Sequence, residues 1–239
     1  MELFSDLPIT NMSTSSLIEV IVKCSKVKSI VVALHVTALN SFKSGELSTK
    51  DFEKVDLLYA DGWSVQLLNY IVGNRKAQRV ATTDLLPLVL SSLHSGREKI
   101  KIGIIGGEEG VAELVKENWN YVEEAFLTFN GFQEDWPKIL KEMREFQPDL
   151  VLLGLGMPLE LKFINQFYDQ LPSCLLLTCG GLLRILAKTE RRSPMILQLF
   201  RLEWLFRILS HPKRNTSRYI KGIHSLFILS LREIRKTKS

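Results

Sequence analysis

Strand-like segments alternate with helix-like segments along most of this 239-residue chain, and Gly-containing turns follow several of the strands. The apolar runs typical of strands are Val27–Leu39, Val55–Ala60, Lys99–Ile105, Ala125–Asn130, Pro148–Leu153 and Cys174–Thr178. Ser48–Lys54 is a short helix or turn. The other segments between the strands are helical, at Trp63–Val72, Thr83–Leu93, Glu109–Trp119, Asp135–Phe146 and Glu160–Gln170. This alternation predicts an α/β fold with a Rossmann-like open, mostly parallel sheet and flanking helices.

The strand ends are the first places to look for function, because ligands of such sheets bind beyond the carboxyl ends of the strands. Asp61, followed by Gly62, comes directly after the second strand. A carboxylate there can take a proton from an attacking hydroxyl group, although Asp-Gly also makes a simple turn. His35 stands within or at the end of the first strand, where it either contacts a ligand or is a satisfied core histidine.

Glycine-containing loops follow three further strands. Gly106 and Gly107 open a helix, whose backbone N–H groups favour phosphate, but they also suit a tight strand-to-helix turn. This segment lacks the full dinucleotide-binding fingerprint and a Walker lysine. Gly156 and Pro158 belong to a loop that either approaches a substrate or ends a strand. Three more candidates complete this edge, at Glu160, Gly180 and Gly181.

Glu160 lies one turn into the helix that follows the Gly156 loop. Its carboxylate is placed to contact a ligand hydroxyl group, and the plainer interpretation is a solvated glutamate on the helix surface.

The C-terminal part of the chain departs from this pattern in both periodicity and charge. Residues Arg191–Ser239 hold twelve Lys/Arg and two acidic residues, a net charge of +10, whereas residues 1–190 sum to −5. Helical spacing covers Met195–Leu209 and, after a break at Pro212, Arg218–Ile234. We therefore predict an α/β domain at residues 1–190 and a basic amphipathic helical appendage at 191–239.

The appendage is suited to an anionic partner. Arg207, Arg214 and Arg218 follow at spacings of seven and four, which can align three guanidinium groups toward a diphosphate or form a solvated basic face. Trp204, Phe227 and the basic cluster at 232–238 favour an anionic membrane surface. RNA is the rival partner, because basic and aromatic side chains together also suit nucleic acid.

Other sequence features narrow the class of protein. Cys24, Cys174 and Cys179 have no metal-ligand spacing, which indicates buried thiols in a reducing compartment, with Cys179 also a candidate to line a site. The four histidines are scattered, so no metal site is expected. No basic segment opens the chain, so no secretory signal is expected. No apolar run reaches the length of about 18 residues that spans a bilayer.

Taken in order, these segments resemble the WecG/TagA/CpsF family of bacterial glycosyltransferases (glycosyltransferase family 26), over roughly residues 15–221. The order and spacing of the segments, more than any one of them, carry the resemblance. They are Asp61-Gly62, Arg79 with Thr83-Asp84, Ile104–Gly107, Pro148-Asp149 with Gly154–Pro158, Gly180-Gly181, Arg192–Pro194, Leu202–Arg207, Pro212–Arg214 and Arg218-Tyr219.

The resemblance implies an inverting, metal-independent transferase without a cofactor. It would move a sugar from a UDP-sugar to a saccharide linked to polyprenyl diphosphate, in exopolysaccharide, capsule or other cell-surface glycan synthesis. By analogy Asp61 is the general base, the basic tail closes over the site, and its arginines stabilise the departing UDP. The expected location is peripheral, on the cytoplasmic face of the bacterial inner membrane. Self-association is left open, and nucleic acid is not an expected partner.

The chain departs from the family pattern around the expected donor and acceptor pocket. The family's Thr-x-Asn pair falls on Ala33 and His35, and its Pro-x-Gln-Glu segment begins at Pro158 and places Glu160 in the glutamine position. An acidic residue after the Gly-Gly turn is replaced by Arg184. We interpret these changes as altered sugar specificity. The alternative is a catalytically degenerate homologue that binds lipid-linked glycan or acts as a scaffold.

Overall fold

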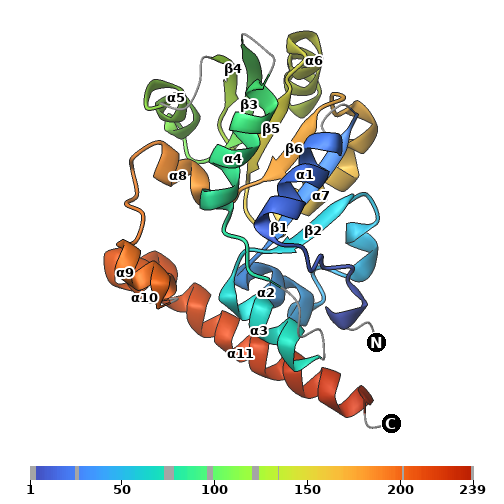
Figure 1. Ribbon diagram of the computed structural model, residues 1–239, viewed down its shortest axis with the longest axis vertical. Helices are drawn as coiled ribbons and strands as arrows, with labels where there is room; N and C mark the ends of the chain where they lie inside the picture. The colour runs from blue at the N-terminus through green and yellow to red at the C-terminus, as the bar shows by residue number, and fades with distance from the viewer. Residues whose placement is uncertain are drawn as a thin grey trace.

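A computed structural model describes residues 4–24, 27–72, 78–95, 99–119, 124–133, 135–200 and 202–237. Its centre is a six-stranded sheet in the order β2-β1-β6-β5-β3-β4, in which every neighbouring pair is parallel (Figure 1). The strands are β1 (Ser29–Leu34), β2 (Leu57–Ala60), β3 (Ile100–Gly106), β4 (Glu124–Phe129), β5 (Leu150–Gly154) and β6 (Leu175–Thr178). The predicted open α/β fold is confirmed, and the sheet is entirely parallel.

Helices cover both faces of the sheet. One face is covered by α1 (Thr14–Cys24), α4 (Thr82–His94), α5 (Val111–Glu117) and α8 (Leu182–Leu186). The other face is covered by α2 (Val36–Ser44), α3 (Trp63–Ile71), α6 (Trp136–Phe146), α7 (Leu159–Phe167) and the short turns η1 (Phe4–Asp6), η2 (Thr49–Phe52) and η3 (Tyr168–Gln170). Strands β1, β3, β5 and β6 are buried almost throughout, as their apolar runs predict, whereas the edge strand β4 is half-buried along its length.

Three predicted segments differ from the structure. The first strand was expected to continue to Leu39, but it ends at Leu34 and α2 begins at Val36, because the chain turns at His35 to pack a helix on the sheet. The predicted helix Met195–Leu209 is two helices, α9 (Met195–Leu199) and α10 (Glu203–Ser210). The last helix, α11 (Pro212–Thr237), starts well before the expected Arg218, with proline at its first position, where no N–H is needed.

The sheet reverses its strand order between β1 and β6. Strand β1 is followed along the chain by β2 on one side, whereas the later strands lie on the other side of it. Such a switch point creates a crevice at the carboxyl ends of the flanking strands. The residues that follow β1, β2 and β6 therefore lie around one crevice.

The C-terminal helices return across this body. Figure 1 shows α11 (red) running below α2 and α3, with α9 and α10 at the N-terminal end of α11. Glu233, which is buried, accepts hydrogen bonds from Ser5 N and Oγ at 3.1 and 2.7 Å. Lys238, the last basic residue of the predicted cluster 232–238, lies outside the described residues. None of the helices in the described ranges is long and apolar enough to cross a bilayer.

Gly222 marks the closest contact between α11 and α2. A Cβ atom at this position would lie 1.9 Å from Cγ2 of Val36, a β-branched side chain with little freedom to move. Alanine in place of glycine normally stabilises a helix interior by about 1 kcal/mol. Here we expect the opposite, a loss of about 1–3 kcal/mol, because the added methyl group overpacks the contact. Denaturant unfolding of Gly222→Ala measures this.

Two further variants separate overpacking from helix propensity. Val36→Ala in the Gly222→Ala background should recover part of the lost stability, because it removes the clashing methyl groups. Lys221→Ala, one position away and exposed, should change the free energy of unfolding by less than about 0.5 kcal/mol. A Gly222→Ala protein more stable than the parent would contradict the close contact.

Candidate active site

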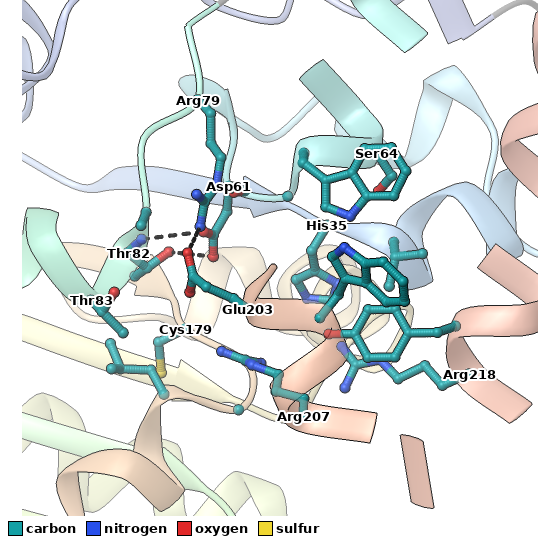
Figure 2. Close-up of a pocket in the computed structure, with 18 residues that line it drawn as sticks. His35, Asp61, Ser64, Arg79, Thr82, Thr83, Cys179, Glu203, Arg207 and Arg218 are labelled. Atoms are coloured by element: carbon teal, nitrogen blue, oxygen red, sulfur yellow. Dashed lines mark hydrogen bonds and ion pairs between the residues drawn. The ribbon is translucent and has the colours of Figure 1, made fainter. Parts of the chain in front are cut away.

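A pocket lies at the switch point of the sheet, between the strand ends and the C-terminal helices (Figure 2). The strands contribute His35 after β1, Asp61 after β2, and Cys179 and Gly181 after β6. The segment that leads into α4 supplies Arg79, Ala81, Thr82 and Thr83, and the tail supplies Glu203, Trp204, Arg207, Arg218 and Tyr219. The free space inside is about 100 Å³, below the roughly 300–1,000 Å³ typical of small-molecule sites, because tail side chains project into it.

Asp61 is held by three groups of the protein body. Thr82 Oγ1 donates a hydrogen bond to Asp61 Oδ2 at 2.9 Å. The hydroxyl group of the buried Tyr59 in turn hydrogen-bonds to the Thr82 hydroxyl at 2.7 Å, which supports this contact. Arg79 Nε donates to the Asp61 backbone carbonyl at 2.7 Å. Burial raises the pKa of Asp61, while the Thr82 hydrogen bond and the nearby Arg79 and Arg207 act in the opposite direction. The carboxylate is therefore a stronger base than an ordinary aspartate, and its orientation is fixed.

The tail reaches the same carboxylate from the other side. Glu203 Oε1 pairs with Arg79 Nη2 at 2.5 Å, so α10 is tied to the segment beside Asp61. Figure 2 shows Glu203 next to Asp61 and Thr82, with Arg207 below and Arg218 beside His35. Two other ion pairs join these parts of the chain, Asp84 with Arg192 and Glu190 with Arg214. Opposite charges of body and tail thus meet around the pocket.

Arg218 and Arg207 make the pocket electropositive around the His35 ring. Burial first, and then the charges of Arg218 and Arg207, lower the pKa of His35 to about 3, so its ring is neutral at physiological pH. His35 Nδ1 lies 2.6 Å from Thr37 Oγ1. The Arg218 Nε group is buried and has no hydrogen-bond partner among the residues that the structure describes. An anionic ligand in the pocket would satisfy that donor.

Cys179 lies on the pocket wall, as the alternative interpretation of its position beside the glycine turn suggested. Burial raises the pKa of its thiol well above the usual value, with the nearby Glu160 adding to the effect. The thiolate required of a nucleophile is therefore not formed at neutral pH. Cys179 shapes the wall of the pocket.

Glu160 is neither a solvated surface residue nor part of the pocket lining. Its side chain is fully buried, and Oε1 accepts hydrogen bonds from Gly156 N at 3.1 Å and Gly180 N at 3.0 Å. The carboxylate thereby joins the loop after β5 to the loop after β6. Within the described part of the chain, Oε2 has no hydrogen-bond partner. Burial raises the pKa of Glu160 to about 7, although both glycine N–H groups lower it.

This shift makes the stability of the protein depend on pH. Between the unfolded-state value of about 4.5 and the folded value of about 7, the unfolded chain ionises first, so stability falls as pH rises. Glu160→Gln keeps the Oε1 acceptor and removes the titration. We expect its stability relative to the parent to increase from pH 5 to pH 8, by up to about 3 kcal/mol. Denaturant unfolding at both pH values measures this difference, and a constant difference would contradict the raised pKa.

Several residues predicted from the sequence lie outside the pocket. Gly106 and Gly107, both with positive φ, bring the end of β3 against β5, where a Cβ at Gly106 would lie 2.4 Å from the Gly154 carbonyl oxygen. Gly156 and Gly180 serve as donors to Glu160. The other predicted site residues that do not line the pocket are Pro158, Asp84 and Arg214. Arg214 is exposed and paired with Glu190, because the break at His211 turns it away from the face that carries Arg207.

Other lining residues were not among the predicted site residues. Thr82 is one of them, and its hydroxyl group holds Asp61. Trp63 follows the Asp-Gly turn, and Glu203, Trp204 and Tyr219 come from the tail. Trp204 was expected to face a membrane, but it lines the pocket. The centroid of its ring lies 6.4 Å from the centroid of the Tyr219 ring. In the described part of the chain, no group of three or more His, Cys, Asp or Glu side chains could hold a metal ion.

The fold and the pocket define a Rossmann-like α/β protein with an arginine-lined pocket at its switch point. The profile of the WecG/TagA/CpsF glycosyl transferase family matches residues 1–239, and the chain belongs to this family. The chain is 25% identical over 163 residues to the N-acetylglucosaminyldiphosphoundecaprenol N-acetyl-beta-D-mannosaminyltransferase of Bacillus spizizenii. It is 25% identical over 158 residues to the enzyme of the same name from Staphylococcus aureus. Both alignments cover 66% of this chain and 62% of the relative, so the chain spans less than two thirds of the relatives' length.

Proposed function

We propose that this protein is an inverting glycosyltransferase that moves a sugar from a UDP-sugar to a saccharide carried on polyprenyl diphosphate. One observation carries the proposal: a fixed carboxylate of raised pKa, Asp61, shares a pocket with the guanidinium groups of Arg207 and Arg218. A base and an anion site on opposite sides of one pocket are what such a displacement needs. The family and the names of its relatives point to the same chemistry.

In this mechanism the acceptor hydroxyl oxygen forms a bond to the anomeric carbon of the donor sugar. The bond from that carbon to the UDP diphosphate oxygen breaks, and the hydroxyl proton moves to Asp61. A single displacement inverts the anomeric centre, so one base suffices. Thr82 and Arg79 keep the Asp61 carboxylate aimed into the pocket.

Negative charge grows on the diphosphate as UDP leaves. Arg207 and the buried Arg218 Nε offset this charge, in place of a metal ion. The neutral His35 ring adds a hydrogen-bonding group without competing for the diphosphate. Because the free space is small, the tail side chains have to shift when the donor binds, which breaks or stretches the contact between Arg79 and Glu203.

The acceptor class places the protein at a membrane surface. A polyprenyl chain holds the acceptor in the bilayer, so we propose that the protein acts on the cytoplasmic face of the inner membrane. The basic tail, with exposed apolar side chains along α9 and α11, would approach anionic lipid there. The reaction would be one step in the synthesis of exopolysaccharide, capsule or another cell-surface glycan.

The acid limb of the pH–rate profile tests whether Asp61 is the base. Below its pKa Asp61 is protonated and cannot accept the proton, so kcat/KM should rise with pH through that pKa. The Thr82 hydrogen bond lowers the pKa, so Thr82→Val should move the limb to higher pH. Thr83→Val changes the neighbouring position and keeps the Thr82 hydrogen bond, so it should leave the limb in place. An unmoved limb in Thr82→Val would assign the titration to another group.

Turnover itself is tested with a donor panel. UDP-glucose, UDP-glucuronate, UDP-N-acetylmannosamine and its uronate are each offered with lipid-diphosphate mono- and disaccharides, and UDP release is measured. Release that requires both donor and acceptor supports the proposal. Donor binding without release on any acceptor would instead favour a degenerate, glycan-binding homologue, and no donor binding would overturn the transferase assignment.

A further inference from the structure

An apolar groove opens beside the pocket and shares two walls with it. Trp63 and Trp204 line both cavities, one on each side. The groove is also lined by Gln66, Leu67 and Tyr70 of α3 and by Phe200 and Leu202 between α9 and α10. Its volume of about 410 Å³ falls within the roughly 300–1,000 Å³ of small-molecule sites. The groove is therefore a ligand-sized cavity that the proposed chemistry does not use.

We propose that this groove binds the first isoprene units of the acceptor's polyprenyl chain, next to its diphosphate. The inference rests on the proposed function and assigns a subsite to it. Among the described residues that line the groove there is no charged side chain, and Gln66, the indole N–H groups and the Tyr70 hydroxyl are the only side-chain polar groups. Aromatic and aliphatic walls suit a branched hydrocarbon chain, and the described lining gives no charged partner to a phosphate.

The groove is continuous with the pocket, and this favours the polyprenyl chain of the acceptor as its occupant. A lipid-linked saccharide carries its sugar, its diphosphate and its hydrocarbon chain in that order. The pocket offers Asp61 to the acceptor sugar, and the groove begins at the two tryptophans that line both cavities. Because Arg207 and Arg218 are assigned to the donor diphosphate, the acceptor meets the base and then the apolar walls, in the order of its own sugar and hydrocarbon chain. A free phospholipid would not require the groove to join the pocket.

The outer end of the groove is exposed. Leu67, Tyr70 and Phe200 are 37%, 58% and 66% exposed, and Ile196 and Leu199 of α9 continue the apolar surface outward. Exposed apolar area in contact with water is unfavourable, and such patches mark ligand or membrane contacts. The chain of the acceptor can leave the groove along α9 and remain in the bilayer. Binding of the chain in the groove would thereby fix the position of the acceptor diphosphate relative to the pocket.

Calorimetry of the full chain tests the groove without turnover. Farnesyl diphosphate and isopentenyl diphosphate carry the same anionic group and differ mainly in hydrocarbon length. We expect farnesyl diphosphate to bind at least about tenfold more tightly, because burial of each additional methylene contributes about 0.8 kcal/mol. Equal affinity for the two diphosphates would overturn the proposal.

Matched variants locate the binding. Leu67→Ser and Phe200→Ser should remove most of the preference for farnesyl diphosphate and leave isopentenyl diphosphate binding unchanged. Leu88→Ser, on α4 and 46% exposed, and Phe132→Ser, after β4 and 79% exposed, are the controls of the same residue types outside the groove. They should keep the preference. If groove variants lower only liposome flotation, the groove contacts the bilayer and not the acceptor, and the proposal is wrong.

Acceptor kinetics separate this proposal from the proposed function. With a saccharide diphosphate carrying an isopentenyl or a farnesyl chain, Leu67→Ser should raise KM about tenfold for the farnesyl acceptor, with kcat unchanged. Turnover with equal KM for both acceptors refutes the groove and leaves the transferase assignment intact. If no acceptor turns over while farnesyl diphosphate still binds through Leu67 and Phe200, the assigned reaction fails and the isoprenoid site stands.

Discussion

Asp61→Asn is expected to lower kcat by about 10²- to 10⁴-fold, the range that a positioned general base contributes. The amide has nearly the same size and can keep the hydrogen bond from Thr82, so the pocket should hold its shape. It cannot accept a proton from the acceptor hydroxyl at any pH of interest. Steady-state UDP release with donor and lipid-linked acceptor measures the loss.

Two controls make the Asp61 result specific to catalysis. The donor should bind the Asp61→Asn protein with unchanged affinity in calorimetry, because the proposed diphosphate contacts are Arg207 and Arg218. The melting temperature should not fall, since burial of an ionised carboxylate is unfavourable and the amide removes it. A variant that keeps the full rate would show that another group, or the acceptor's own diphosphate, takes the proton.

The body of the fold could be predicted from the sequence because its signals are local. The buried strands are largely apolar runs, and a glycine stands at or just after the end of every strand except β1, where the chain turns at His35. The first strand was drawn too long because Val36–Leu39 is as apolar as the strand before it. Only packing on the sheet, with the chain turned at His35, distinguishes helix from strand there.

The residues of the candidate site could likewise be predicted only where the sequence carries a local signal. The rule that ligands bind at strand ends found Asp61, His35 and Gly181, which all line the pocket. This rule could not identify Glu203, Trp204 or Tyr219, because no local pattern shows that helices far along the chain return to the pocket at the end of β2. The role of Glu160 was equally hidden, since it depends on two loops meeting around one buried carboxylate.

The domain boundary near residue 190 stays a prediction. Ion pairs, the Ser5–Glu233 hydrogen bonds and the Gly222–Val36 contact join the tail to the body on both sides of the crevice. The charge contrast that suggested a separate appendage therefore also describes two complementary surfaces within one molecule. Activity and tail docking are expected to be lost together.

Arg207→Ala is expected to lower kcat/KM by about 10²- to 10³-fold, as loss of one fixed donor to a developing oxyanion does. Arg207 lines the pocket and lies near enough to Asp61 and His35 to influence both of their pKa values. Arg207→Lys keeps the charge but not the planar fork, so it should recover only part of the rate. Single-turnover measurements would place the loss on the chemical step rather than on product release.

Arg214→Ala is the matched comparison, because sequence spacing and structure disagree about this residue. Spacing alone grouped Arg214 with Arg207 and Arg218, whereas the structure pairs it with Glu190 on an exposed surface. We therefore expect Arg214→Ala to stay within a few-fold of the parent rate, with its main effect on how firmly α11 docks. Equal losses from Arg207→Ala and Arg214→Ala would mean that the tail acts on the diphosphate through its overall charge and not through the two guanidinium groups that reach the pocket.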